Sequence, residues 1–149
     1  MSGRFEFSTD LEVDLEVAAR LVDSPAAVAY LMSPLLRLDP LDGTPSERFR
    51  AGPQRFRVRA LGLFPVGTQT IDVSWPAGAD HILLDVGGNG FTQRYAHHIE
   101  LHRLGSGRTR CIDRTEIDAG VLTTPVTFGF WLVNRIVQLR WPRLLRLLD

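Results

Sequence analysis

Two long segments of alternating residues flank the sequence Gly-Ser-Gly at residues 105–107, and no other feature constrains the fold as strongly. A short glycine-rich turn between two such segments predicts a β-hairpin. Pairing Leu104 with Arg108 about this turn sorts both arms into one inner and one outer face, because side chains alternate along a strand. The inner pairs are then Leu101 with Cys111, Ile99 with Asp113, His97 with Thr115 and Tyr95 with Ile117, and the outer pairs include Arg94 with Asp118 and His98 with Arg114.

Four further segments alternate with a period of two and extend the predicted sheet. At the N-terminus, mostly apolar residues from Phe5 to Leu15 alternate with polar ones, which predicts a strand over residues 5–16. The segments 55–64, 68–75 and 81–86 follow the same rule. We therefore expect a curved antiparallel sheet of about six to seven strands, in the α+β class.

Helical spacing appears between the first two strands. Over residues 17–34, Ser24 is a predicted N-cap, Pro25 takes the first helical position, and Pro34 ends the helix. These residues predict two short helices after the first strand.

The last segment, residues 123–149, predicts one long helix with Thr124 as N-cap and Pro125 at its first position. Its apolar residues recur at spacings of three and four, with Gln138 on the opposite side and a kink or restart at Pro142. The stripe consists of Val126, Phe130, Val133, Val137, Trp141, Leu144 and Leu148.

Composition limits the classes of function. With 149 residues, the chain (1–149) is expected to form a single domain around one core. The formal net charge is zero, which disfavours nucleic-acid binding. All 17 basic residues are Arg, so a P-loop and a Schiff-base lysine are excluded. Cys111 is the single cysteine and no apolar leader follows the N-terminus, so we expect a cytoplasmic protein.

The apolar final segment has three interpretations. A transmembrane span is excluded because the uncharged run before Arg135 is far shorter than the roughly 20 residues required. A membrane-surface helix stays open, with arginines among lipid head groups. Packing onto the chain's own sheet is the default for such a stripe. Peripheral membrane contact, and the choice between monomer and homodimer, are left open.

The order of these elements resembles the helix-grip fold of the START-like and Bet v 1-like (SRPBCC) superfamily, which includes polyketide cyclase-like and lipid-transfer proteins. The resemblance covers the N-terminal strand "FEFSTDLEVDLE", the helical pair "VAARLVDSPAAVAYLM", the strand meander with "CIDRTEID", and the terminal helix "RIVQLRWPRLLRLL". It implies a cavity between the sheet and the long helix that holds an apolar or amphipathic small molecule, such as a lipid, polyketide or isoprenoid-like compound.

One pair of inner-face residues is a candidate for chemistry. His97 and Asp113 lie diagonally across the hairpin, within reach of each other, and could act as a general base with an orienting carboxylate. The simpler interpretation is a buried pair that satisfies its own hydrogen bonds. The predicted ligand-binding residues are Phe7, Trp75, Tyr95, His97, Asp113, Thr115, Phe130, Val133, Asn134 and Val137.

Two other motifs predict no site. His98, Glu100 and His102 share the outer face, but the two histidines are about 13 Å apart on a strand, too far to bind one metal ion. The sequence "GGNG" at residues 87–90 predicts a turn, because no helix follows to form a phosphate site. No cofactor or metal site is predicted.

The leading hypothesis is a protein that binds or carries a hydrophobic small molecule, and is not an enzyme. One alternative is a polyketide cyclase or dehydratase that uses His97 and Asp113 as acid and base. A second alternative is an interaction module whose C-terminal helix presents Trp131 and its arginines to a membrane or a partner protein.

Overall fold

The computed structural model describes residues 2–43 and 46–148. Its helices are α1 (Leu15–Val22), α2 (Pro25–Met32) and α3 (Thr123–Arg146), the last preceded by a 3-10 turn, η1 (Gly120–Leu122). Its strands are β1 (Gly3–Leu11), β2 (Leu36–Pro40), β3 (Gly52–Ala60), β4 (Phe64–Ser74), β5 (His81–Asp85), β6 (Gly88–Asn89), β7 (Arg94–Gly105) and β8 (Arg108–Asp118).

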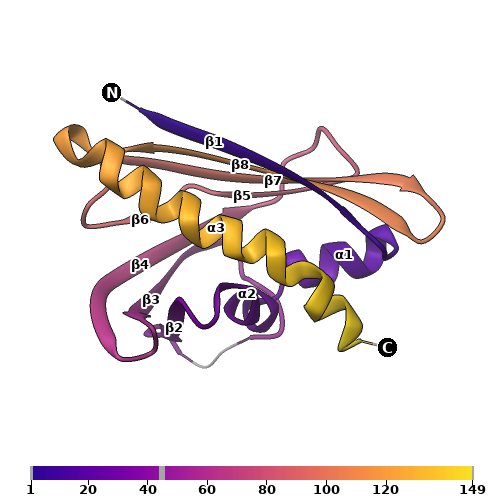
Figure 1. Cartoon of the computed structure of the whole chain (residues 1–149), viewed down its shortest axis with the longest axis horizontal. Helices are drawn as coiled ribbons and strands as arrows, with labels where there is room; N and C mark the ends of the chain where they lie inside the picture. The colour runs from indigo at the N-terminus through magenta and orange to yellow at the C-terminus, as the bar shows by residue number, and fades with distance from the viewer. Residues whose placement is uncertain (1, 44–45, 149) are drawn as a thin grey trace.

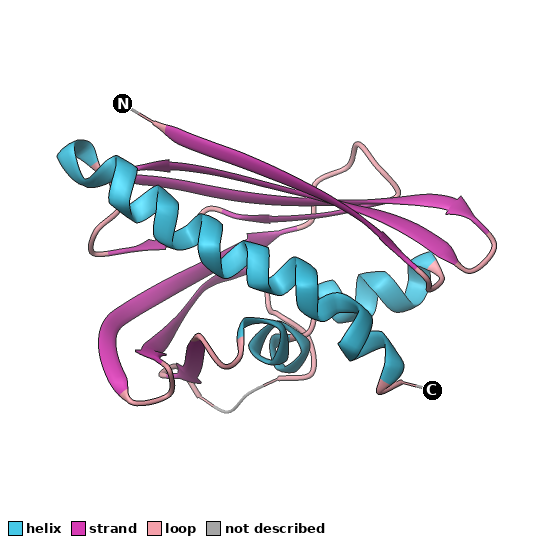
Figure 2. Cartoon of the chain, in the orientation of Figure 1, coloured by secondary structure: helices cyan, strands magenta, loops and turns pink. Residues whose placement is uncertain are grey.

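The strands form one antiparallel sheet in the order β1-β8-β7-β5-β4-β3-β2, and the two-residue strand β6 pairs with β4. Figure 1 shows α3 lying across one face of this sheet, with β1 and β8 along one side and β4 to β2 curving round on the other. Figure 2 shows the two short helices at the end of the sheet where α3 finishes. The predicted α+β class, curved sheet and long terminal helix are confirmed.

The predicted register of the central hairpin is also confirmed. Leu101 faces Cys111 and His97 faces Thr115. Only the tip differs, since a bulge after Arg103 makes Gly105 the partner of Arg108. A glycine turn tolerates such an irregularity at little cost.

The N-terminal strand is shorter than predicted. The alternation of residues predicts a strand through residue 16, but β1 ends at Leu11 and α1 begins at Leu15. Ala18 and Val22 are the buried residues of α1 and follow the spacing of a helix. Asp14 lies between β1 and α1, and its Oδ1 accepts the backbone N–H of Gly107 at 2.9 Å. This hydrogen bond ties the β1–α1 connection to the turn of the β7–β8 hairpin. Local periodicity could not reveal that contact.

The second short helix begins as predicted. Ser24 Oγ accepts the backbone N–H of Ala27 at 3.2 Å, and Pro25 takes the first helical position. The helix ends at Met32, shortly before Pro34.

The long helix differs in three details. It begins at Thr123, two residues before the predicted first position, Pro125, because the buried Thr123 hydroxyl accepts the Ala119 N–H at 3.0 Å and donates to the Gly120 carbonyl at 2.7 Å. Pro142 lies inside the helix without ending it. Gln138 is buried against the sheet, where a position on the polar side had been predicted.

The interior contains two apolar clusters where one core was predicted. The larger lies around α1, α2 and the end of α3, and includes Leu11, Leu101 and Trp141. The smaller lies under the start of α3, around Tyr95 and Ile117. Polar residues are also buried on the inner face, among them Asp85, Asp113, Thr115, Asn134 and Gln138.

Candidate functional site

A chain of hydrogen bonds crosses the interior between the sheet and α3. His97 Nε2 on β7 lies 2.7 Å from Asp113 Oδ1 on β8. Gln138 Nε2 on α3 donates to Asp113 Oδ2 at 3.4 Å, and Thr9 Oγ1 on β1 donates to Gln138 Oε1. We call these four residues the interior polar network. It connects three adjacent strands to the helix that covers them.

Strand pairing explains why these side chains meet. His97 is the partner of Thr115, so its contact with Asp113, two residues earlier on β8, is diagonal. On the other side of β8, Asp113 is the partner of Phe7, and Thr9 follows on the same face of β1. The His97–Asp113 contact that alternation allowed is therefore present in the structure.

A second carboxylate lies beside His97. Asp85, at the end of β5, is the strand partner of His97 and is buried. Its Oδ1 accepts the backbone N–H groups of Asp72 at 2.8 Å and Gly87 at 2.9 Å. Burial raises the pKa of the Asp85 carboxyl, and those two hydrogen bonds and His97 only partly oppose the shift.

The two carboxylates determine the titration of the site. Burial by itself lowers the pKa of His97, but the charge of Asp113, its hydrogen bond to the ring, and the charge of Asp85 outweigh burial and raise this pKa. The pKa of Tyr95 lies well above its ordinary value, first through burial and then through the same two carboxylates. Both shifts stabilise the protonated form of the side chain relative to the same group in water.

Apolar side chains flank the network on both elements. Tyr95 and Phe130 pack with ring centroids 5.4 Å apart. Phe7 contacts Trp131 of α3, with centroids 6.3 Å apart. Two further predicted lining residues, Val133 and Val137, are half-buried.

Two polar residues predicted to line the site have separate arrangements. Thr115 is buried beside His97, and its Oγ1 has no hydrogen-bond partner among the described residues. Asn134 is also buried, and its Nδ2 donates to the Phe130 carbonyl of the same helix at 2.8 Å. Asn134 thus faces the sheet, while Thr115 keeps an unused hydroxyl.

Trp75, the remaining predicted lining residue, belongs to a different cluster. Its Nε1 donates to Asp23 Oδ1 at 2.8 Å, and the Arg48 guanidinium lies 4.4 Å from the centre of its ring. His81 Nε2 lies 3.0 Å from the same Asp23 oxygen. These contacts join the two short helices to β4 and β5, a structural role.

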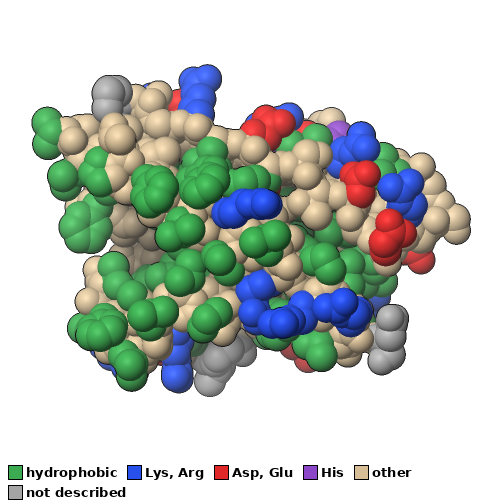
Figure 3. Space-filling view, viewed as in Figure 1, with side chains coloured by type: hydrophobic (Ala, Val, Ile, Leu, Met, Phe, Trp, Pro, Cys, Tyr) green, Lys and Arg blue, Asp and Glu red, His purple; other side chains and the backbone are tan. Residues whose placement is uncertain are grey.

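The inner face is not completely filled. The His97 side chain keeps 19% of its surface accessible, although it projects from the inner face of a central strand. Figure 3 shows a recess between the side chains of α3 and those around the β3–β4 hairpin. Two depressions lie elsewhere: one of about 430 Å³ beside β4 and β6, and one of about 220 Å³ between α2, β2 and β3. Neither is lined by a residue of α3.

Solved structures share this arrangement over nearly the whole chain. A START superfamily protein from Mycobacterium smegmatis has 12% sequence identity and a TM-score of 0.66, with 95% of this chain and 98% of that chain covered. An aromatase/cyclase from a Streptomyces species has 11% identity and a TM-score of 0.61, with 96% and 95% covered. The major latex-like protein of Panax ginseng has 14% identity and a TM-score of 0.56, with 93% and 97% covered.

The chain has the helix-grip fold of START-like and Bet v 1-like proteins. No protein-family model and no curated protein sequence matches it. The identities are too low to carry a function across, because one fold supports many sites. The helix-grip fold that the sequence resemblance implied is confirmed, and its chemistry must be argued from the residues.

Three residues that lie in or beside the interior polar network were absent from the predicted site. Thr9 and Asp85 lie on inner strand faces, so strand alternation could have found them once the neighbouring strands were aligned. Gln138 follows Asn134 by four residues and precedes Trp141 by three, which is helical spacing. The predicted apolar stripe excludes Gln138 because a polar side chain on a helix is expected to be exposed.

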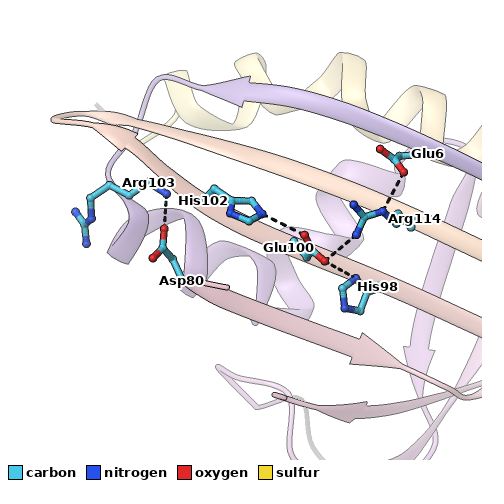
Figure 4. A network of polar contacts seen from close by, with 7 residues as sticks. All are labelled: Glu6, Asp80, His98, Glu100, His102, Arg103 and Arg114. Atoms are coloured by element: carbon cyan, nitrogen blue, oxygen red, sulfur yellow. Dashed lines mark hydrogen bonds and ion pairs between the residues drawn. The ribbon is translucent and has the colours of Figure 1, made fainter. Parts of the chain in front are cut away.

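The outer face of the helix-grip sheet carries a separate charged network (Figure 4). Glu100 pairs with His98 at 3.4 Å, with His102 at 3.1 Å and with Arg114 at 2.7 Å, and Arg114 also pairs with Glu6 at 2.9 Å. Hydrogen bonds from His102 and Arg114 outweigh burial and lower the pKa of Glu100. Among residues 2–43 and 46–148, no group of three potential ligands could hold a metal ion.

Among the helices that the structure describes, none is both long enough and apolar enough to cross a bilayer.

Proposed function

We propose that the protein binds an apolar or amphipathic small molecule between α3 and the inner face of the sheet. The observation that carries this proposal is the partly accessible His97, held by Asp113 at 2.7 Å and lying beside the aromatic ring of Tyr95. His81 in the Asp23 cluster is similarly accessible, at 18%, so accessibility by itself does not distinguish the two histidines. His97 differs in its place, on the inner face of the sheet beside Tyr95 and next to Phe130 of α3. An accessible imidazole offers a hydrogen bond to a ligand that enters beside it.

The surroundings define the chemistry of such a ligand. Tyr95, Phe130 and Val133 provide aromatic and aliphatic contact surface, and His97 and Thr115 provide one hydrogen-bonding edge. Binding sites for small molecules combine these features, a mainly apolar lining with a few converging polar groups. The ligand therefore has an apolar body and a polar group that accepts a hydrogen bond.

Thermal unfolding in the presence of fatty acids, quinones and aromatic polyketides tests this proposal. A ligand at about 100 times its Kd stabilises the folded state by about 2.7 kcal/mol. We expect a rise in Tm for the wild type and a smaller rise for His97→Gln. A matched control, His102→Gln on the outer face, should respond as the wild type does. If no compound in these classes raises the Tm, the proposal is wrong.

The His97–Asp113 hydrogen bond supports a second candidate function, acid–base catalysis of a cyclisation or dehydration. A general base oriented by a carboxylate requires this kind of geometry. Turnover of a bound poly-β-keto compound, lost in both His97→Gln and Asp113→Asn, would establish an enzyme. Binding without turnover would establish a carrier.

A further inference from the structure

The long helix is apolar on its solvent-facing side as well as on the side that packs against the sheet. Eight of its exposed residues recur at helical spacing and so form one stripe, five of them apolar and three of them arginines. They are Phe128, Trp131, Leu132, Arg135, Leu139, Pro142, Arg143 and Arg146. Phe128 and Leu139 keep 62% and 60% of their surface accessible. Large apolar side chains mixed with arginines on one helix face are typical of helices that lie at a membrane surface.

The hairpin between β3 and β4 adds a second exposed apolar group. Four apolar residues at or near its tip are exposed, namely Leu61, Leu63, Phe64 and Val66. Figure 3 shows apolar side chains over α3 and over this hairpin on the same face of the molecule. We call the α3 stripe and the hairpin tip together the apolar face. Exposed apolar surfaces of this extent mark interaction sites.

Charge indicates what covers the apolar face. Residues 123–149 contain four arginines and one acidic residue, Asp149, at the last position. Arg135, Arg143 and Arg146 make no ion pair with any residue that the structure describes. By contrast, on the outer face of the sheet, Arg110 and Arg114 are paired with carboxylates. The apolar face thus combines exposed aromatic residues with uncompensated positive charge.

A second copy of the chain fits this face poorly. In a two-fold dimer the same patch meets itself, so the arginines of one α3 would face those of the other without an acidic partner. Anionic lipid head groups complement the arginines, and aromatic and leucine side chains are favoured at the boundary between head groups and acyl chains.

We propose that α3 and the β3–β4 hairpin form a docking surface for an anionic membrane. Phe128, Trp131 and Phe64 enter the head-group boundary, while Arg135 and Arg146 contact lipid phosphates.

Vesicle flotation tests the proposal with the full chain. The wild type should float with vesicles that mix phosphatidylcholine and phosphatidylglycerol. It should remain in the bottom fraction with vesicles of phosphatidylcholine alone. The variants R135Q/R146Q, F128S/L139S and L63S/F64S should each lower the partition coefficient by about tenfold or more. The control R94Q/R110Q removes the same charge from the outer face of the sheet and should float as the wild type does. The four residues changed on α3 and the two changed on the hairpin are all exposed, so circular dichroism should show unaltered folding.

Three results would overturn the proposal. The wild type could fail to bind either vesicle. The control could lose binding as strongly as R135Q/R146Q, which would mean that net charge alone acts. Light scattering could show a dimer that F128S/L139S dissociates, which would mean that a second copy covers this face.

Discussion

At the scale of single residues, His97 has an unusual position for a histidine on the inner face of a sheet. It lies between two carboxylates, Asp113 at 2.7 Å and Asp85 on the neighbouring strand. Their charges outweigh burial and raise the pKa of His97. The imidazolium is therefore stabilised in the folded protein relative to the unfolded chain.

This shift predicts how stability depends on pH. A raised pKa in the folded state gives a stabilisation that is fully present below about pH 6.5, the ordinary pKa of histidine, and is lost as pH rises through the folded pKa. We expect the free energy of unfolding of the wild type, relative to His97→Gln, to fall as pH increases above 6.5. Urea denaturation of both proteins from pH 5.5 to 8.5 measures this difference in free energy. The range extends about one pH unit or more on each side of 6.5, the ordinary pKa of histidine.

The Asp113→Asn variant is the matched control for this experiment. Its amide keeps a hydrogen-bonding group next to His97 but removes the charge that contributes most to raising the pKa. We expect an NMR titration of this variant to give a lower His97 pKa than in the wild type. An unchanged pKa would contradict the role assigned to Asp113.

At the scale of elements, the orientation of α3 determines what the interior contains. Gln138 faces Thr9 and Asp113, and the next residue, Leu139, faces solvent. A buried amide is tolerated here because both of its ends have hydrogen-bond partners. The helix therefore contributes a polar group to the interior and an apolar stripe to the surface.

Adjacent substitutions in α3 test this orientation. Gln138→Leu leaves the Asp113 and Thr9 groups without their partner, so we expect a loss of about 1–3 kcal/mol in the free energy of unfolding. Leu139→Gln changes an exposed position and should alter that free energy by less than about 0.5 kcal/mol. Chemical denaturation measures both. Equal effects would mean that the helix is rotated from the position described here.

The connection after β5 offers a second test at this scale. A Cβ atom at Gly87 would lie 1.9 Å from the Thr70 carbonyl oxygen, whereas one at Gly90 would meet no atom within 4 Å. We expect Gly87→Ala to lower stability by about 1–3 kcal/mol or more through this clash, and Gly90→Ala to be neutral. A Gly87→Ala protein as stable as Gly90→Ala would show that β4 and the Gly87 turn are not in close contact.

At the scale of the whole molecule, most of the fold could be predicted from the sequence because it depends on local periodicity. The β7–β8 register followed from alternation about one turn, and the His97–Asp113 contact followed from that register. Gln138 and Asp85 could not be placed in the same way. Their positions depend on how α3 lies on the sheet and on which strand pairs with β7, which are both long-range properties. The exposed apolar face likewise emerges only when α3 and the β3–β4 hairpin are seen together.

The central claim is that the region between α3 and the inner face is open to an apolar molecule beside His97. A crystal structure under xenon pressure tests it most directly, because xenon enters apolar cavities and can be located by its electron density. We predict xenon between Phe130, Val133 and His97. Continuous side-chain packing in that region, with no xenon bound, would contradict the account.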